Sequence, residues 1–197
     1  MNFKGNGTAW SEEPQAQKDW YNGIEFRSKL ESKTAQAFDN LGVKYEYEPD
    51  GYKLSNGLWY KPDFYLPDAH QFAECKGVMS NEDSAKIVGL VEDTGKPVLV
   101  LSYTNAMLVM RVGDSPDGEI VTYSGDEVAL SWCEECGKPW FLGWPDTYRC
   151  RCCGAYDGDH HLVGCFDVES ATNLFKHGQE LAADKPIYRQ IAENFNN

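Results

Sequence analysis

The chain has 197 residues, of which 42% are hydrophobic and 13% aromatic, and this composition excludes an intrinsically disordered protein. The formal net charge of −13 excludes a protein that coats nucleic acid through a general positive field, but not one that touches phosphates locally or through bound metal ions. No apolar leader or membrane-length apolar stretch is found, so we expect a cytoplasmic protein with no membrane partner.

The first predicted elements are an arm, a helix and three strands. Residues 1–22 show no clear periodicity and are predicted to form a loose N-terminal arm. From Ile24 an apolar stripe predicts a helix that stops at Gly42. Residues 43–49 alternate as a half-buried strand does, and Asn56-Gly57 predicts a hairpin turn between two further strands.

The middle of the chain predicts a second helix between strands. Residues 71–77 read as a strand that ends at a glycine, and residues 96–103 read as a strand that is expected to be central. Two more strands are expected at 106–112 and 120–125. The intervening helix, 81–95, is expected to face inward through Ala85, Ile87, Val88 and Val91.

This order of elements predicts the α/β (α+β) class, with a core at residues 23–125. A small cysteine-rich unit is expected at 126–166. A C-terminal helical tail, broken at Pro186, is expected at 167–197.

Charged residues interrupt a predicted strand in the segment "PDFYLPDAHQFAECKG", which begins at Pro62. Glu74 and Lys76 are two apart and project from one face of the strand, while Cys75 points to the other. Asp63 opens the preceding strand, and pairing of the two strands would bring its carboxylate close to Glu74. Converging carboxylates repel each other unless a cation lies between them. Such oxygen ligands suit Mg²⁺ or Mn²⁺, and a metal ion beside an ammonium group can promote phosphodiester hydrolysis.

The same residues also have a purely structural interpretation. In it, Asp63 is a turn residue, and Glu74 and Lys76 form a solvated sheet face. That interpretation explains the alternation. It does not explain why Pro62-Asp63, the strand end at Gly77 and the helix that carries Glu31 occur together.

A family resemblance is carried by these residues and by two segments upstream. Pro62-Asp63 and Glu74-Cys75-Lys76 resemble the PD-(D/E)xK signature of the restriction-endonuclease-like nuclease superfamily. "FRSKLE" and "LGVKYEYEP" are similar to phage-encoded nucleases of the endonuclease I type, which resolve Holliday junctions. The resemblance runs from about Glu25 to Tyr103. It implies a restriction-endonuclease-like mixed sheet flanked by helices.

The resemblance also implies roles for particular residues. Asp63 and Glu74 would bind the catalytic Mg²⁺ or Mn²⁺ together with the backbone carbonyl of Cys75, and Lys76 would orient or activate the attacking water. Glu31, on the first helix, would hold a second metal ion or its water shell.

Two residues at the start of that helix are candidates for contact with a DNA phosphate, Arg27 and Ser28. An ion pair between Arg27 and Glu31, four residues on, is the alternative role for Arg27. We expect the positive charge to be concentrated around five residues. They are Arg27, Lys29, Lys33, Lys61 and Lys76.

Five of the seven cysteines lie between Cys133 and Cys153. Two Cys-x2-Cys-Gly knuckles, separated by thirteen residues, have the spacing of a zinc ribbon. Four thiolates leave no open coordination position, so the zinc ion is expected to be structural. The expected ligands are Cys133, Cys136, Cys150 and Cys153.

Other residues near the knuckles leave alternatives open. Cys152 could replace its neighbour Cys153, and Cys165 or the His160-His161 pair could take part in an unusual ligand set. Four aromatic residues between the knuckles either cover the metal hairpins or stack on exposed bases. They are Trp140, Phe141, Trp144 and Tyr148.

From these patterns we expect a metal-dependent DNA endonuclease with a structural zinc ribbon. The resemblance implies branched DNA as substrate, a homodimer with two active sites, and a phage protein in the host cytoplasm. Two other classes stay open, a non-catalytic DNA- or protein-binding module with a nuclease-like core, and an assembly protein in which the ribbon docks onto a partner.

Overall fold

The computed structural model describes residues 16–112, 118–143, 149–156 and 161–183. Most of the predicted arm and several other predictions fall outside these residues. Those predictions concern Trp144, Tyr148, His160 and the helix break at Pro186.

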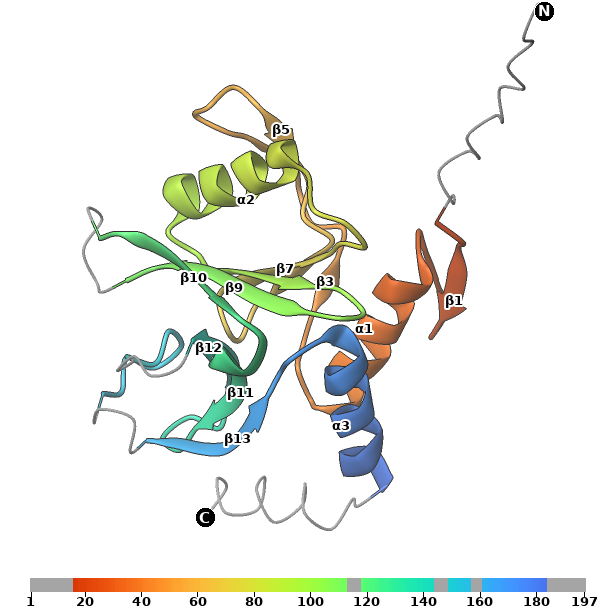
Figure 1. Ribbon diagram of the computed structural model, residues 1–197. Coiled ribbons are helices and arrows are strands. Elements are labelled where there is room, and N and C mark those ends of the chain that lie inside the picture. Colours follow the sequence, from red (N-terminus) through yellow and green to blue (C-terminus); the bar gives the residue numbers. More distant parts are fainter. Residues whose placement is uncertain (1–15, 113–117, 144–148, 157–160, 184–197) are drawn as a thin grey trace, which may run out of the picture.

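A six-stranded mixed sheet forms the centre of the molecule (Figure 1). The adjacent strands β7 and β8 are parallel, and the other neighbouring pairs in this sheet are antiparallel. Residues 98–101 are all buried between two neighbouring strands, as the prediction of a central strand requires. In spatial order the strands are β10 (Ile120–Ser124), β9 (Ala106–Arg111), β8 (Val98–Leu101), β7 (Gln71–Cys75), β6 (Phe64–Leu66) and β3 (Glu46–Tyr47).

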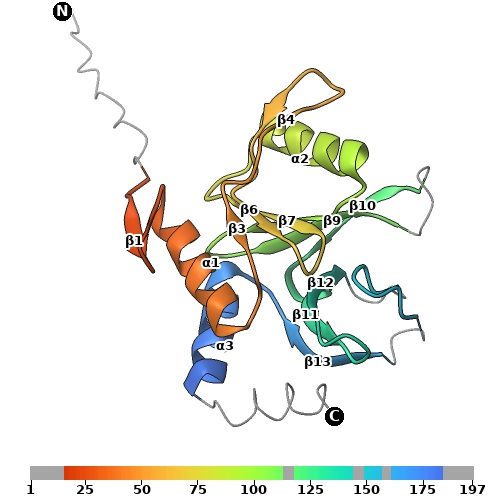
Figure 2. The same ribbon diagram turned by 180° about the vertical axis from the view of Figure 1, so that it is seen from behind.

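Helices cover both faces of this sheet (Figures 1 and 2). Helix α2 (Asn81–Thr94) joins β7 to β8 and packs on one face through Ile87, Leu90 and Val91. Ala85, predicted to face inward, is exposed, so the apolar face of α2 is rotated toward Leu90. Helix α1 (Lys29–Asn40) lies on the opposite face, and α3 (Ala171–Ala183) packs against α1.

The start of α1 differs from the prediction. Residues from Ile24 to Phe26 are not helical but form β2, which pairs with β1 (Asp19–Tyr21) across an Asn22-Gly23 turn. Both turn residues have positive φ, at 48° and 79°, as a tight hairpin requires. Helix α1 begins only at Lys29, because the Ser28 side chain caps it by accepting a hydrogen bond from the Glu31 amide at 3.2 Å.

A second hairpin projects above α2. Strands β4 (Tyr52–Lys53) and β5 (Trp59–Tyr60) pair across Asn56-Gly57, which confirms the predicted turn. At the other side of the molecule, a three-stranded sheet carries the cysteine-rich segment. Its strands, in spatial order, are β12 (Pro139–Gly143), β11 (Val128–Cys133) and β13 (Leu162–Asp167), and a short 3-10 turn, η1 (Gly125–Glu127), precedes β11.

The small sheet packs directly against the central one. The buried side chain of Gln71, at the start of β7, donates to the Phe141 carbonyl at 2.7 Å and accepts from the Phe141 amide at 2.8 Å. The ring of Phe141 also lies 6.1 Å from that of Phe38 on α1. One apolar cluster therefore contains residues of α1, the central sheet and the small sheet.

Candidate active site

Asp63 and Glu74 meet where β6 and β7 pair. The register aligns Phe64 with Ala73, so Asp63 lies level with Glu74 on the neighbouring strand. The Asp63 amide donates to a Glu74 carboxylate oxygen at 3.2 Å, and the Cys75 amide donates to an Asp63 carboxylate oxygen at 2.8 Å. Both acids are almost fully buried, with 4% and 3% exposure. The antiparallel pairing thus brings two acids together that are eleven residues apart in sequence.

These carboxylates line a cleft of about 400 Å³. Glu31 reaches it from α1, and Lys76 reaches it from the end of β7. Cys75 also lines the cleft, but its thiol is directed to the hydroxyl of Thr34 on α1, at 3.4 Å. The structure therefore brings the four predicted side chains, from three segments of the chain, to one place.

Burial gives Asp63 an unusual affinity for protons. Desolvation, together with the charge of Glu74, raises the pKa of Asp63 to about 7, although a hydrogen bond from the Cys75 amide and the charge of Arg27 oppose the shift. A buried carboxyl with a raised pKa is a site where negative charge is only partly compensated. A bound cation would complete this compensation.

Arg27 supplies part of that positive charge. Its guanidinium group contacts Asp63 at 2.5 Å, Glu48 at 3.1 Å and Glu31 at 3.8 Å. The predicted ion pair with Glu31 is therefore present, but it is the longest of the three contacts. Lys61 also binds Glu48, at 3.0 Å. Arg27 thus links Asp63 to two other acids at one side of the cleft.

Glu31 is held firmly at the N-terminus of α1. One of its carboxylate oxygens accepts hydrogen bonds from the Tyr47 hydroxyl at 2.6 Å and from the Arg27 amide at 3.2 Å, and the other accepts from the Ser28 hydroxyl at 2.9 Å. Within the described residues, the acids of the cleft do not form a group of three whose oxygens all lie within 4.8 Å of one another. With Arg27 in place, the predicted metal ligands are adjacent but do not converge on a single point.

Lys76 lies between two carboxylates. Its ammonium group is 3.0 Å from a Glu74 oxygen and 3.1 Å from an Asp83 oxygen. Burial alone would lower the pKa of Lys76, but Glu74 and Asp83 outweigh burial and raise it, so the side chain is charged at neutral pH. Asp83 is itself fixed by hydrogen bonds from the backbone amide and hydroxyl of Ser80, which cap α2.

Tyr60 was not foreseen from the sequence. It is 7% exposed, and its hydroxyl has no hydrogen-bond partner among the described residues. Burial, together with the adjacent charge of Glu74, raises its pKa, so Tyr60 presents a protonated hydroxyl to the cleft. No local sequence pattern marks it, because Tyr60 reaches the cleft through the packing of the hairpin with α2. The other lining residues missed in the sequence are Trp59, Asp83 and Lys86.

The positive charge of this region is distributed partly as expected. Of the five predicted cations, Arg27, Lys61 and Lys76 line the cleft. Lys33 instead lies 5.9 Å and 5.5 Å from the ring centres of Tyr103 and Phe175. Lys86 is the fourth basic side chain of the cleft, which also has four carboxylates. The cleft is thus balanced in charge, although the whole chain has a net charge of −13.

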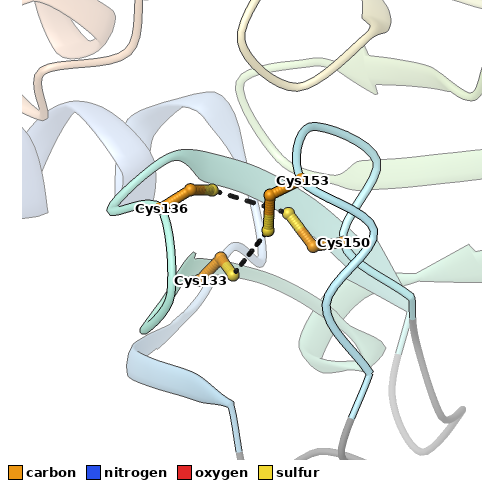
Figure 3. A group of neighbouring side chains, drawn as sticks. All are labelled: Cys133, Cys136, Cys150 and Cys153. Atoms are coloured by element: carbon orange, nitrogen blue, oxygen red, sulfur yellow. Dashed lines mark hydrogen bonds between the residues drawn. The ribbon is translucent and has the colours of Figure 1, made fainter.

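The four predicted zinc ligands form a second candidate site (Figure 3). Their sulfur atoms all lie within 4.8 Å of one another, with Cys133 3.8 Å from Cys153 and Cys136 3.7 Å from Cys150. Burial raises the pKa of Cys133 to about 11, so without an ion this thiol keeps its proton at neutral pH. Four converging sulfurs at this spacing suit a tetrahedral zinc ion, which would displace such protons.

The two knuckles have the same backbone hydrogen bonds. Gly137 donates to the Cys133 carbonyl at 2.8 Å, and Gly154 donates to the Cys150 carbonyl at 2.9 Å. Both glycines have positive φ, at 65° and 76°, a conformation that glycine adopts without strain because it has no Cβ. The repeated turn aims each pair of thiols at the same point.

The structure also decides between the alternatives near the knuckles. Cys152 and Cys165 are exposed and lie outside the four-sulfur group, which includes Cys153. Trp140 and Phe141 are buried, so neither is an exposed surface for base stacking. His161 is buried too, and its ring stacks with that of Trp140 at 6.4 Å.

The chain resembles a phage endonuclease over part of its length. No protein-family model matches the chain. Over 65 residues it is 40% identical to Endonuclease I of Escherichia phage T7. The match covers 31% of this chain and 42% of that protein, so this chain spans less than half of the relative's length. This distant, partial similarity confirms the predicted resemblance. Among the described residues, none of the helices has the length and apolar character needed to cross a bilayer.

Proposed function

We propose that the protein is a metal-dependent DNA endonuclease that hydrolyses phosphodiester bonds. The observation that carries the proposal is the meeting of Asp63, Glu74 and Lys76 at one cleft, with Asp63 hydrogen-bonded to Glu74 and Lys76 ion-paired to Glu74. The partial similarity to Endonuclease I of Escherichia phage T7 supports it independently. A restriction-endonuclease-like core at residues 23–125 is part of the same proposal, with a zinc ribbon at 126–166 and a helical tail at 167–197.

The carboxylates of Asp63 and Glu74 would bind Mg²⁺ or Mn²⁺, together with the backbone carbonyl of Cys75. Their fit rests on the raised pKa of Asp63, which marks uncompensated negative charge, and on oxygen donors being the ligands that these ions prefer. Glu31 would hold a second ion or its water shell. A metal ion at this place supplies Lewis-acid polarisation of a phosphate oxygen.

Lys76 would act as a fixed positive charge rather than as a base. Its raised pKa keeps it protonated beside Glu74 and Asp83, so it can orient a water molecule and offset the charge that develops on the phosphate. In the hydrolysis, the water oxygen bonds to phosphorus and releases a proton to solvent. The bond between phosphorus and the leaving sugar oxygen breaks, and that oxygen takes up a proton from solvent.

Arg27 and Ser28 would contact the DNA phosphate at the edge of the cleft. In the structure Arg27 neutralises Asp63, and a cation bound by Asp63 would free its guanidinium for a phosphate oxygen. The equal number of basic and acidic groups in the cleft supports DNA binding, because bound cations would make this region positive in an acidic protein.

A direct test is the cleavage of supercoiled plasmid and of a labelled four-way junction in Mg²⁺, Mn²⁺ or EDTA. We expect metal-dependent cutting, reduced by about 100-fold or more in Lys76→Ala. Lys176→Ala is the matched control, because Lys176 is an exposed lysine on α3 that pairs with Glu180. A wild-type protein that cuts neither DNA, or a folded Lys76→Ala that cuts normally, contradicts the proposal. A preference for the junction would support branched DNA as substrate. A homodimer in the phage host cytoplasm belongs to the same proposal.

The second candidate is a non-catalytic binding module. It is favoured by the contact of Arg27 with Asp63, which supplies a positive charge without a metal ion, and by the net charge of −13. DNA or protein binding that survives EDTA and occurs without turnover would support this function instead.

A further inference from the structure

An exposed tryptophan lies at the edge of the cleft. Trp59 on β5 is 67% exposed, yet it lines the same cleft as Asp63, Glu74 and Lys76. Trp20 on β1 is exposed to the same extent, but it is not among the residues that line the cleft. Exposure of a single aromatic ring is common on protein surfaces. The position of Trp59, rather than its exposure, therefore separates it from Trp20.

The hairpin that presents Trp59 is fixed to α2. The Ser55 amide donates to Asp93 at 2.7 Å, and the Asn56 side chain donates to the Ala85 carbonyl at 3.0 Å. Gly89 on α2 makes room for this contact, since a Cβ there would lie 2.6 Å from the Asn56 side-chain nitrogen. The indole is thus displayed by an anchored hairpin, which lowers the entropy lost when a ligand binds.

The strand pattern directs Trp59 outward and its neighbour inward. Tyr60 is 7% exposed and packs into the core under α2, so the alternation of β5 leaves Trp59 on the outer face. Lys53 lies directly opposite Trp59 in the hairpin and shares that face. Lys61 and Lys86 line the cleft beside it. Lys61 is ion-paired to Glu48 and Lys86 to Glu82. Phosphates on either side of a nucleotide would contact these lysines in place of the two acids.

We propose that Trp59 is a stacking platform for an unpaired nucleobase of single-stranded DNA, next to the phosphate bound in the cleft. This inference rests on the proposed function for its ligand class. A flat, exposed indole with lysine side chains nearby suits any base with a free face. Bases inside a duplex are already stacked on their neighbours, so the platform selects nucleotides outside a helix.

The test is the affinity of full-length protein for a labelled single-stranded oligodeoxynucleotide, measured by fluorescence anisotropy with Mg²⁺ in a Lys76→Ala background that prevents cleavage. We expect Trp59→Ala to weaken binding by roughly 5- to 100-fold, the range for loss of one stacked base. Trp59→Phe should retain most of the affinity. Trp20→Ala should bind like the parent, because it removes an equally exposed ring outside the cleft.

A matched change in the DNA makes the test specific. A series of oligonucleotides would each carry one abasic site, at a different place in the chain. One of them should bind the parent protein more weakly than intact DNA, by about the same factor as Trp59→Ala weakens binding. The same abasic DNA should then bind Trp59→Ala no more weakly than intact DNA. Equal affinities of parent and Trp59→Ala would overturn the inference. The inference would also be overturned if the parent bound no DNA measurably, or if Trp20→Ala lost as much affinity as Trp59→Ala. It would equally be overturned if Trp59→Ala weakened binding to a fully abasic oligonucleotide by the same factor as binding to intact DNA.

Failure of this inference can be told from failure of the proposed function. If wild type cuts DNA and Trp59→Ala binds as well as its parent, only the stacking platform is wrong. If wild type cuts nothing but the loss in Trp59→Ala follows the missing base, only the nuclease proposal is wrong.

Discussion

The cleft and the four-cysteine site both gather groups that repel each other or keep their protons when no cation is bound, but they do so in opposite ways. The cysteines come from two identical turns, and their sulfurs already lie within 4.8 Å of one another. The acids of the cleft come from α1, from β7, from α2 and from the residue before β6, and Arg27 contacts two of them in place of an ion. A closed, preformed site suits a permanent structural metal. A site neutralised by a movable side chain suits an ion that enters with its substrate.

The largest effect that this comparison predicts is loss of the cysteine site. Replacement of Cys133 by Ser should abolish stoichiometric zinc and lower Tm by about 10 °C or more, because ligation energy contributes directly to folding. Metal analysis and calorimetry measure the two quantities. Cys165→Ser, which changes an exposed cysteine outside the group, should leave both unchanged. Full zinc content in folded Cys133→Ser would show that the four sulfurs are not the ligands.

A smaller effect is expected from Asp63 and depends on pH. Its folded pKa of about 7 lies above the usual value of an aspartate, so its contribution to stability is complete below about pH 4 and is lost as pH rises to 7. In EDTA, wild type should therefore lose about 3 kcal/mol of unfolding free energy relative to Asp63→Asn between pH 4.5 and pH 7.5.

Urea unfolding of both proteins at the two pH values measures this difference. Any titration at the cysteine site cancels, because it is common to both proteins. A pH dependence that is the same in wild type and Asp63→Asn would show that Asp63 ionises normally in the folded protein.

The smallest predicted effect is competition between Arg27 and a metal ion. Removal of the guanidinium in Arg27→Met should cost about 1 kcal/mol of stability, since the Arg27 side chain is half exposed and its ion pairs are screened. It should also raise Mn²⁺ affinity about fivefold, because the ion no longer displaces a bound cation from Asp63. Calorimetric titration without DNA measures this change.

The control for that titration is Arg111→Met. Arg111 is the last residue of β9, lies outside the cleft and donates a hydrogen bond to the Gly118 carbonyl. Its loss should therefore leave Mn²⁺ affinity unchanged. Weaker Mn²⁺ binding in Arg27→Met would mean that Arg27 supports the metal site and does not compete with it.

Local patterns in the sequence were sufficient for much of the molecule. The four cysteines were predictable because each knuckle is encoded within a few residues, and the turn geometry follows from the glycine. The meeting of Asp63 with Glu74 was predictable because the two acids lie on either side of a short connection between neighbouring antiparallel strands, at the same distance from it. The error at the start of α1 came from following an apolar stripe across Ile24 and Phe26. The capping pair Ser28 and Glu31 carried the better signal.

Other features depended on long-range packing. Tyr60, Asp83 and Lys86 reach the cleft because the hairpin and α2 pack together over β7, which no local pattern records. The exposed position of Ala85 follows from the way α2 is rotated on the sheet. The hydrogen bonds between Gln71 and Phe141 join residues seventy positions apart.

Gln71 also has a consequence for attempts to shorten the protein. The side-chain amide of Gln71 hydrogen-bonds both backbone groups of Phe141, as a neighbouring strand would. Gln71 is the first residue of the five-residue strand β7, which contains Glu74 and is followed directly by Lys76. A chain cut after residue 125 would leave this amide without its partner and uncover the ring of Phe38. The cysteine-rich segment thus packs against the strand that carries Glu74, and chemistry measured on a trimmed core would belong to a different molecule.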